Sequence, residues 1–570
     1  MIQLPYAHAK LIEQAIRAAQ AAGDLPAFES PAIEISAPKR ADQGDYASNI
    51  AMKLTKLVNQ PAPVIAQTII KHLPQADFVA SVVVAGAFIN FTLSKSFVEQ
   101  QIEAVIDEGD VLFTLEIGKG KRAQVEFVSA NPTGPLTVGR SRGGIVGDAM
   151  ARVLESAGYQ VEREYYFNNA GNQMVMLGNS LKIRYLQALD KPVTVPGKDD
   201  TTFYQGDYLI DYAKDLITEQ GEALVDADWK PFKEYVEKRI FDWIKGSLAR
   251  VGIEHNVFFN EDSLYQDGTV WKALEDLKAQ GHIYSASEWA GATEEEKAKA
   301  AHLTPAQWFR SSTFEDDKDR ILVRGDGTPT YTLPDIAYHR NKIERGFDLL
   351  VNVLGADHGS QYKVVQYAMT ALGLDPSKIH VIIVQMVRFV KDGQPFKGST
   401  RRGVYETLDE LIDEVGADAI RYHLLARSSS TQMNFDLNEV VKQSNDNPVY
   451  YIQNAHVRCA GIFREAAARG VTDEGADLSL LTTDELTLVR KILEMGDVIE
   501  TAVDKFEPHR IAFYAQELAA IFHPLYDRAR VLHSEVPADV AKARLRLYRA
   551  AQIAFKRLLT LMGMTAPDRM

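Results

Sequence analysis

The sequence predicts a multidomain protein of α/β and α type, in which a parallel-sheet domain lies between a small α+β domain and an all-α bundle. The chain has 570 residues, more than a single hydrophobic core usually holds. Between residue 121 and about residue 410, strand-like and helix-like stretches alternate, which favours a parallel sheet covered by helices. From about residue 445 onward, apolar residues recur every three or four positions, which is typical of packed helices.

The composition predicts a soluble, cytoplasmic protein with no membrane partner. Hydrophobic residues make up 46% of the chain, and no apolar stretch reaches the roughly 20 residues that a membrane span requires. The N-terminal stretch MIQLPYAHAKLIEQAIRAAQ has the pattern of an amphipathic helix rather than of a signal peptide. The single cysteine, Cys459, excludes an internal disulfide and a multi-cysteine zinc site. With a net charge of −14, any nucleic acid would have to be held by local basic patches.

Four segments are expected along the chain. Residues 1–95 combine two helical patterns with the strand-like ending SVVVAGAFINFTL. Residues 120–410 hold the parallel sheet, and their charged, helix-rich stretch from about 175 to 310 is interpreted as an insertion. Residues 411–444 are expected to form a connecting helical segment, and residues 445–570 the bundle.

The first chemical motif is a strand, a glycine-rich loop and a helix. QVEFVS alternates as a strand does, and ANPTGPLTVGRSRGG follows it with two prolines and four glycines. Such a loop directs backbone N–H groups and a helix N-terminus at phosphate, although an ordinary connecting loop is an equal alternative. No Gly-Lys-Ser/Thr follows, so the motif is not a P-loop.

The stretch VEFVSANPTGPLTVGRSRGGIVGDAMARVLESAGY resembles the ATP signature of the arginyl-tRNA synthetases, which implies a class I, Rossmann-like catalytic domain. Where that family usually has His-x-Gly-His, this chain has Thr137 and Arg140 in place of the two histidines. Thr137 keeps a hydroxyl donor, Arg140 supplies a planar cation suited to phosphate, and Arg142 is expected to add to it. The resemblance makes Thr137 and Arg140 catalytic, and it assigns further ATP contacts to Pro132, Thr133, Gly134 and Gly139.

The second motif is a cationic loop after a hairpin signal at Asp392-Gly393. The sequence KGSTR resembles the class I signature KMSKS, and a basic surface turn is the alternative. The resemblance implies that Lys397 and Arg401 neutralise the leaving pyrophosphate. It also implies that Lys397, Ser399 and Val387 bind ATP.

A pocket for arginine is expected around a helix that starts near Pro334. Arginine recognition requires a carboxylate against the guanidinium and a flat aromatic surface, which Asp335 and Tyr331 offer. The alternatives are a carboxylate that stabilises the helix start and a core tyrosine. The resemblance implies further arginine contacts at Glu126, Ser129, Asn131 and Gln361, ATP contacts at Gly355, Asp357 and His358, and a pocket wall at Asn168, Gly171 and Gln173.

Both ends of the chain resemble the RNA-binding domains of the same family. In the N-terminal domain Tyr46 and Asn49 are candidate base contacts, with core packing or capping as the alternative. QSNDNPVYYIQNAHVR and the ending MGMTAPDRM are similar to the family's anticodon-binding bundle. Candidate tRNA contacts there are Tyr451, Ala455, Arg458 and Met570. A basic stripe that would offset the acidic charge is expected from Arg544, Arg546, Arg549 and Lys556.

Together the resemblances imply an arginine–tRNA ligase. Such an enzyme attaches L-arginine to its cognate tRNA through arginyl-adenylate and releases AMP and pyrophosphate. ATP is expected to arrive with Mg²⁺ as a substrate complex, with no tightly bound cofactor and no dedicated metal site. A monomer is expected. The missing histidines keep open a synthetase-like protein that binds tRNA with weakened catalysis, and a class I ligase for another amino acid is a second alternative.

Overall fold

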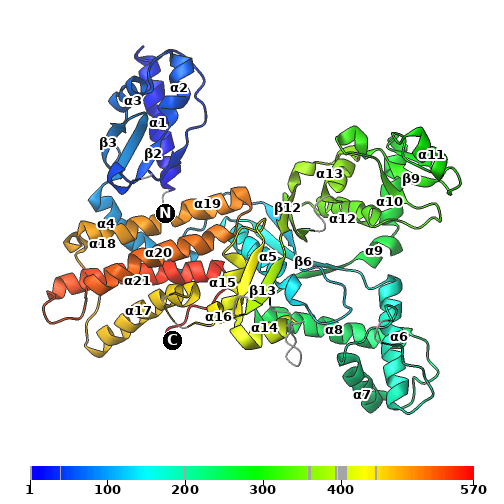
Figure 1. Cartoon of the computed structure of the whole chain (residues 1–570). Coiled ribbons are helices and arrows are strands. Elements are labelled where there is room, and N and C mark those ends of the chain that lie inside the picture. Colours follow the sequence, from blue (N-terminus) through cyan, green and yellow to red (C-terminus); the bar gives the residue numbers. More distant parts are fainter. Residues whose placement is uncertain are drawn as a thin grey trace. The chain divides into compact units, whose positions relative to one another are not determined.

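The computed structural model describes residues 3–38, 40–197, 200–356, 361–391, 394–395, 407–442, 444 and 446–570 (Figure 1). The chain divides into two units. One comprises residues 1–115, 443–505 and 510–570, and the other comprises residues 116–442 and 506–509.

The second unit is built on a five-stranded, wholly parallel sheet in the order β12-β11-β5-β6-β7. The strands are β5 (Arg122–Glu126), β6 (Gln160–Phe167), β7 (Val257–Asn260), β11 (Leu349–Gly355) and β12 (Ile379–Val384). Chain order runs from β5 outward to β7 on one side and from β11 to β12 on the other. This is the doubly wound arrangement, and its order reverses between β5 and β11.

Helix α5 (Val138–Ser156) follows β5 and packs closely against it. A Cβ at Gly147 would lie 2.4 Å from the side chain of Phe127, so only glycine permits this approach. The predicted strand, glycine-rich loop and helix are therefore present. The first turn of α5 lies at the carboxyl end of β5, beside the point where the strand order reverses.

The segment predicted as an insertion, residues 175–310, is not one continuous insertion, because it contains a strand of the central sheet. Strand β7 lies within residues 175–310, yet it is the edge strand of the central sheet. The helices before it are α6 (Gly171–Ala188), α7 (Tyr208–Gln220) and α8 (Lys230–Arg250). Between β7 and β11 lie α9 (Glu261–Gln266), α10 (Thr269–Ala279), β8 (Ile283–Ala286), α11 (Glu294–Ala300), β9 (Ala306–Phe309), β10 (Arg320–Val323) and α12 (Thr332–Glu344).

The segment after β12 contains strands as well as helices. Helix α13 (Gln361–Ala371) lies between β11 and β12. After β12 follow β13 (Val387–Lys391), β14 (Gln394–Pro395), α14 (Leu408–Val415), α15 (Ala417–Leu425), β15 (Met433–Asp436) and α16 (Leu437–Val440). β13 and β14 pair antiparallel, as the hairpin signal predicts. β15 pairs in parallel with β13, so residues 411–444 are not the purely helical connection that was expected.

The first unit combines the small N-terminal α+β fold with the helical bundle. Its antiparallel sheet has the order β1-β2-β4-β3. The N-terminal elements are α1 (Leu4–Ala21), β1 (Ile35–Ser36), β2 (Tyr46–Ser48), α2 (Ile50–Val58), α3 (Ala62–Lys71), β3 (Val79–Ala85), β4 (Phe88–Leu93) and α4 (Lys95–Glu108). The bundle helices are α17 (Pro448–Ala468), α18 (Thr483–Leu493), α19 (Met495–Lys505), α20 (His509–Arg528) and α21 (Ala538–Leu561). Among the described residues, no helix combines the length and the apolar character that a membrane crossing requires.

Candidate active site

The predicted substrate residues gather where the sheet reverses its order. Glu126 ends β5, Gly355 ends β11, and Asn352 of β11 lies in register with Glu126. Open α/β sheets bind ligands at this place. Directly after β5, Val128 and Ser129 have φ angles of 71° and 43°, a left-handed conformation that is costly for residues other than glycine. Such strain is concentrated at functional sites.

A buried ion pair lies beneath this edge of the sheet. The ammonium of Lys342, which is fully buried, donates to Glu126 at 2.6 Å and to Asn352 at 2.8 Å. Ser129 donates to the other oxygen of Glu126 at 2.9 Å. Burial alone would raise the pKa of Glu126, but the charge of Lys342 and these hydrogen bonds outweigh burial and lower it. Glu126 therefore presents a fixed carboxylate.

Asp335 lies in the first turn of α12, as the sequence predicts. Its pKa is raised to about 7, first because burial disfavours the charged form, and then because Glu126 and Glu261 are negative neighbours. Lys342 opposes these effects only in part. Within the described part of the chain, no side chain donates a hydrogen bond to the carboxyl group of Asp335. An unpaired carboxyl between two acidic groups is suited to receive a cation.

Glu261 is a member of this acidic cluster that sequence reasoning missed. It directly follows β7, and burial raises its pKa. Tyr166 donates to one of its oxygens at 2.6 Å and Asn168 donates to the other at 2.9 Å. The ring of Tyr166 lies 4.5 Å from that of Tyr338, which is only 2% exposed, so this pair of rings supports the acidic cluster from within the core. The sequence signal for Glu261 is the apolar stretch VFFN directly before it, which is typical of a buried strand; the interpretation of residues 175–310 as a helical insertion left this strand out.

Two of the three residues expected in the pocket wall, Asn168 and Gln173, meet at Asn131. Asn131 donates to Gln173 at 3.1 Å and accepts from the backbone N–H of Asn168 at 3.0 Å. Gly171 begins α6, which carries Gln173. The wall therefore joins the loop after β5 to the end of β6 and the start of α6.

Of three other predicted arginine contacts, Ser129 is held by hydrogen bonds, whereas Tyr331 and Gln361 are exposed. Ser129 accepts a hydrogen bond from the backbone N–H of Tyr166 at 3.2 Å, besides donating to Glu126. Tyr331 precedes α12 and is 77% exposed, which contradicts the core-tyrosine alternative and leaves its ring available to a ligand. Gln361 is the exposed first residue of α13.

The ATP loop, residues 127–137, leads into α5. Thr137 and Arg140 are exposed at the start of this helix, and the guanidinium of Arg140 has no ion-pair partner among the described residues. Around Gly139 an added Cβ would meet only the hydroxyl of Thr137, at 3.9 Å, so the backbone is open to close approach. Thr133 and Gly134 are half-buried and Pro132 is buried. An open helix N-terminus beside a free cation is suited to bind phosphate.

Arg142 does not join this group, which corrects the expectation. Its side chain is 1% exposed and donates to the backbone carbonyls of Gln385, Ser428 and Thr431 at 2.8–2.9 Å. Successive residues of an α-helix are rotated by about 100°, so two positions after Arg140 the side chain faces the opposite side. Arg142 fixes α5 to the segments around β13 and β15.

Several predicted ATP-binding and catalytic residues lie outside the described residues, namely Asp357, His358, Lys397, Ser399 and Arg401, as does the turn Asp392-Gly393. Val387 begins β13, where it pairs with Met433 of β15. No group of three or more His, Cys, Asp or Glu side chains within the described ranges is arranged to hold a metal ion.

In the N-terminal domain, Tyr46 is not available as a stacking surface for RNA. It is 4% exposed, its ring lies 4.8 Å from that of His8, and its hydroxyl shares a hydrogen bond with Asp497. The prediction that Tyr46 contacts a base is therefore wrong, and the core alternative holds. Asn49 is half-buried and donates weakly to Glu34 at 3.4 Å.

In the bundle, the three candidate tRNA contacts on α17 differ in accessibility: Tyr451 and Arg458 are partly exposed, and Ala455 is not. Tyr451 is half-buried, with its ring 4.3 Å from that of His523. Arg458 pairs with Asp527 at 3.0 Å, and its side chain is 28% exposed. Ala455 is fully buried and packs the bundle core, so the prediction that it contacts tRNA is wrong.

The C-terminal tail is held along α17. Gln453, His456 and Arg464 donate to backbone carbonyls of residues 565, 567 and 568 at 3.0, 2.9 and 2.8 Å. Met570 remains 58% exposed at the end of this tail. The bundle therefore fixes the segment that presents Met570.

The predicted basic stripe on α21 is already neutralised by acidic partners. The pairs are Arg544–Glu485 (2.5 Å), Arg546–Glu103 (2.8 Å), Arg549–Asp473 (2.6 Å) and Lys556–Asp110 (2.7 Å). Each cation is engaged within the first unit. The expectation that this stripe offers free positive charge to RNA is wrong.

Three family models match the chain. The arginyl tRNA synthetase N terminal domain matches residues 7–93, and the catalytic domain of tRNA synthetases class I (R) matches residues 101–444. The DALR anticodon binding domain matches residues 452–570.

Curated and solved proteins give the same picture. The arginine–tRNA ligase of Citrifermentans bemidjiense is 41% identical over 557 residues, which are 96% of this chain and 97% of the relative. That of Geobacillus thermodenitrificans is 39% identical over 570 residues, 98% of each chain. The structure of a putative arginyl tRNA synthetase from Campylobacter jejuni matches with a TM-score of 0.73 and 31% identity, over 84% of this chain and 100% of that one. Thermus thermophilus arginyl-tRNA synthetase matches over the full length of both chains with a TM-score of 0.75; at 21% identity this concerns the fold alone.

Proposed function

The chain belongs to the arginyl-tRNA synthetases, and from this membership we propose that it attaches L-arginine to its cognate tRNA. The reaction consumes ATP, passes through arginyl-adenylate and releases AMP and pyrophosphate. The observation that carries the proposal is the unpaired carboxyl of Asp335 between Glu126 and Glu261, at the point where the sheet reverses its order. A guanidinium there would neutralise the cluster and donate its parallel N–H groups to a carboxylate.

The first step needs little covalent chemistry from the protein. The carboxylate oxygen of arginine attacks the α-phosphorus of ATP in line, and the bond to the β-phosphate oxygen breaks to release pyrophosphate. The first turn of α5, the guanidinium of Arg140 and the hydroxyl of Thr137 are available to stabilise negative charge on the phosphates. Mg²⁺ enters bound to ATP as part of the substrate.

In the second step, a ribose hydroxyl at the tRNA 3′ end attacks the carbonyl carbon of arginyl-adenylate and AMP leaves. We assign no general base, because positioning and charge stabilisation are sufficient for such transfers. The family membership supports retaining the predicted roles of the remaining site residues. These are Ser129, Asn131, Tyr331 and Gln361 for arginine, Pro132, Thr133, Gly134, Gly139, Gly355, Asp357, His358, Val387, Lys397 and Ser399 for ATP, Lys397 and Arg401 for catalysis, and Asn49, Tyr451, Arg458 and Met570 for tRNA.

The proposed division of labour follows the predicted segments. Residues 1–95 would contact the tRNA body, residues 120–410 would carry out the chemistry, and residues 445–570 would bind the anticodon, joined by residues 411–444. The matched N-terminal and anticodon-binding models support this division. We further propose that the protein is a monomer and that it aminoacylates its tRNA in the cytoplasm.

The test is ATP–pyrophosphate exchange with the intact chain and purified tRNA. Arginine should support exchange, and citrulline, which has nearly the same shape but no positive charge, should not. Exchange with citrulline at a comparable rate would contradict the acidic recognition site. No exchange with arginine at high enzyme concentration would instead leave a synthetase-like protein that binds tRNA without activating arginine.

A further inference from the structure

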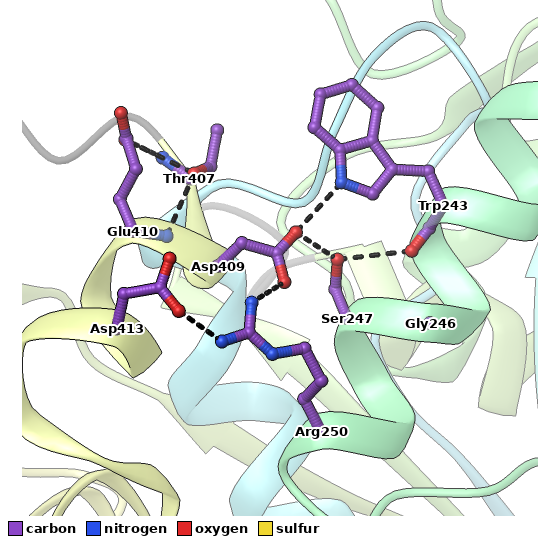
Figure 2. A pocket seen from close by; sticks show the side chains of 8 residues that line it. All are labelled: Trp243, Gly246, Ser247, Arg250, Thr407, Asp409, Glu410 and Asp413. Carbon is purple, nitrogen blue, oxygen red and sulfur yellow. Dashed lines mark hydrogen bonds and ion pairs between the residues drawn. The ribbon is translucent and has the colours of Figure 1, made fainter.

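Two carboxylates, Asp409 and Asp413, join helix α14 to helix α8, and Asp409 makes most of the contacts (Figure 2). Asp409 accepts hydrogen bonds from the indole N–H of Trp243 at 2.8 Å, from Ser247 at 2.6 Å and from Arg250 at 2.7 Å. Arg250 also pairs with Asp413, whose side chain is 71% exposed. These groups line an open cavity of about 710 Å³, and Trp243 is only half-buried. The hydrophobic core therefore does not dictate this contact.

The start of α14 is in turn bonded to the ATP loop. The backbone N–H of Leu408 donates to the carbonyl of Leu136 at 2.8 Å, and Thr407 forms a β-bridge with Thr137. Thr407 also caps α14, with reciprocal hydrogen bonds to Glu410. A displacement of Asp409 would thus be transmitted through two backbone contacts to Thr137.

Trp243 also contacts the residue that holds the middle of the ATP loop. Its ring packs edge-on against that of Tyr208, with centroids 6.0 Å apart. Tyr208 donates its hydroxyl hydrogen to the carbonyl of Thr133 at 2.8 Å and lies against Gly134. Trp243 therefore contacts Tyr208 through its ring and Asp409 through its N–H.

We propose that Trp243 is a positioning residue that fixes the ATP loop to helix α8 of the helical insertion, at the middle of the loop through Tyr208 and at its end through Asp409. The inference rests on the proposed function, because it assigns Trp243 to the ATP half of that reaction. Arginine recognition should not depend on it, since Asp335, Glu126 and Glu261 are held by contacts that involve neither α8 nor α14. The two predicted arginine contacts of the loop itself are held separately, Ser129 by Glu126 and Tyr166, and Asn131 by Gln173 and Asn168. The effect should therefore separate ATP from arginine, which a general loss of structure would not do.

The test compares three conservative variants in ATP–pyrophosphate exchange with tRNA present. Trp243→Phe keeps a ring but loses the N–H, and Asp409→Asn keeps the shape but loses the charge. Each should lower kcat/KM for ATP by about tenfold, the usual size for one hydrogen bond to a charged group, with KM for arginine changed by less than about twofold. The double variant should lose less than the product of the two single effects, because the two changes act on one shared hydrogen bond. Asp413→Asn, which alters a carboxylate that pairs with Arg250 and not with Trp243 among the described residues, is the matched control and should behave as the unmodified chain.

Unchanged kinetics for ATP in Trp243→Phe and Asp409→Asn would overturn the proposal, as would equal losses for ATP and arginine. If Trp243→Phe fails to fold, Asp409→Asn and Tyr208→Phe decide, because Tyr208→Phe removes only the hydroxyl that donates to Thr133. Equilibrium dialysis with ATP separates the two proposals. If the unmodified chain shows no exchange, the proposed function is refuted. The positioning role then stands only if Trp243→Phe and Asp409→Asn still weaken ATP binding in equilibrium dialysis.

Discussion

At the scale of single residues, selection of arginine depends most on Asp335. The protein holds this carboxyl at an energetic disadvantage, between two acidic neighbours and without a partner among the described residues. A guanidinium removes that disadvantage, whereas an apolar or anionic amino acid cannot. The site therefore discriminates by leaving an unsatisfied group that only a cationic substrate satisfies.

Replacing Asp335 should impair arginine use specifically. In Asp335→Asn, KM for arginine should rise roughly tenfold to a hundredfold, as expected for a lost hydrogen bond between charged groups, while KM for ATP stays within about twofold. The melting temperature should not fall, because the change removes a repulsive charge. Glu344→Gln on the same helix is the control, since Glu344 is exposed and, in the described part of the chain, pairs with Arg340 alone. Equal increases in both KM values would remove Asp335 from the arginine site.

The raised pKa of Asp335 also predicts a pH dependence. Below about pH 7 this carboxyl is protonated in the free protein, whereas the guanidinium of arginine stays charged. Arginine affinity should therefore increase as pH rises, by about tenfold per unit below pH 7, and level off above it. Calorimetric titration of arginine between pH 5.5 and about 8.5 measures this. A flat profile, or the same slope in Asp335→Asn, would show that another group is responsible.

The sequence predicted Asp335 and Tyr331 but not Glu261. The first two lie at one helix start, so local signals such as Pro334 were sufficient to place them. Glu261 reaches the site from β7 through the pairing of distant strands, which no local pattern reveals. The orientation of Arg142 was misjudged for a related reason: a basic residue near a phosphate loop looks functional until the rotation of the helix is taken into account.

At the scale of elements, the buried Lys342 joins three parts of the site. It lies on α12, pairs with Glu126 at the end of β5 and donates to Asn352 on β11. Asn352 in turn donates to His339, whose other ring nitrogen donates to the carbonyl of Asp335. The helix that carries Asp335 is thereby fixed to the two strands at the reversal point.

Loss of Lys342 should therefore be costly. Lys342→Met leaves Glu126 buried and unpaired, which should destabilise the second unit by about 3–5 kcal/mol. The double variant Glu126→Gln/Lys342→Met should recover much of this loss in thermal melting, because no isolated charge remains. Lys299→Met is the control: its pair with Glu295 is exposed and should contribute about 0–1 kcal/mol. A single variant as stable as the unmodified chain would contradict the structural role of this pair.

The elements with strong local signals were predicted well. The strand, loop and helix around residues 124–156 have alternation, glycines and a long apolar stripe, and all three are present. Strands β7 and β15, of four residues each, were assigned to helical segments. Four residues give too little alternation to recognise, and both strands exist because the neighbouring strands β6 and β13 provide hydrogen-bonding partners.

At the scale of the whole molecule, the net negative charge of the chain is not offset by a free basic surface on α21, although the sequence predicts one there. The basic residues of α21 form ion pairs with acidic residues that are distant in the sequence, and only the tertiary fold brings these partners together. Arg549→Ala should therefore lower the melting temperature without changing KM for tRNA by more than about twofold. Arg458→Ala should raise KM for tRNA severalfold, because Asp527, the partner of Arg458, is 64% exposed and can be replaced by a phosphate, whereas Asp473, the partner of Arg549, is 13% exposed. A larger effect of Arg549→Ala on tRNA binding would restore the stripe as an RNA surface.

The central claim, that this chain joins arginine to tRNA, is tested most directly by aminoacylation. Purified chain, ATP with Mg²⁺, radiolabelled arginine and tRNA are incubated, and arginine bound to acid-precipitated tRNA is counted together with the AMP released. The account predicts arginyl-tRNA formation with one AMP per arginine transferred, despite Thr137 and Arg140 at the two positions where histidine is usual. Intact tRNA binding with no transfer of arginine, even at enzyme concentrations equal to those of tRNA, would contradict it.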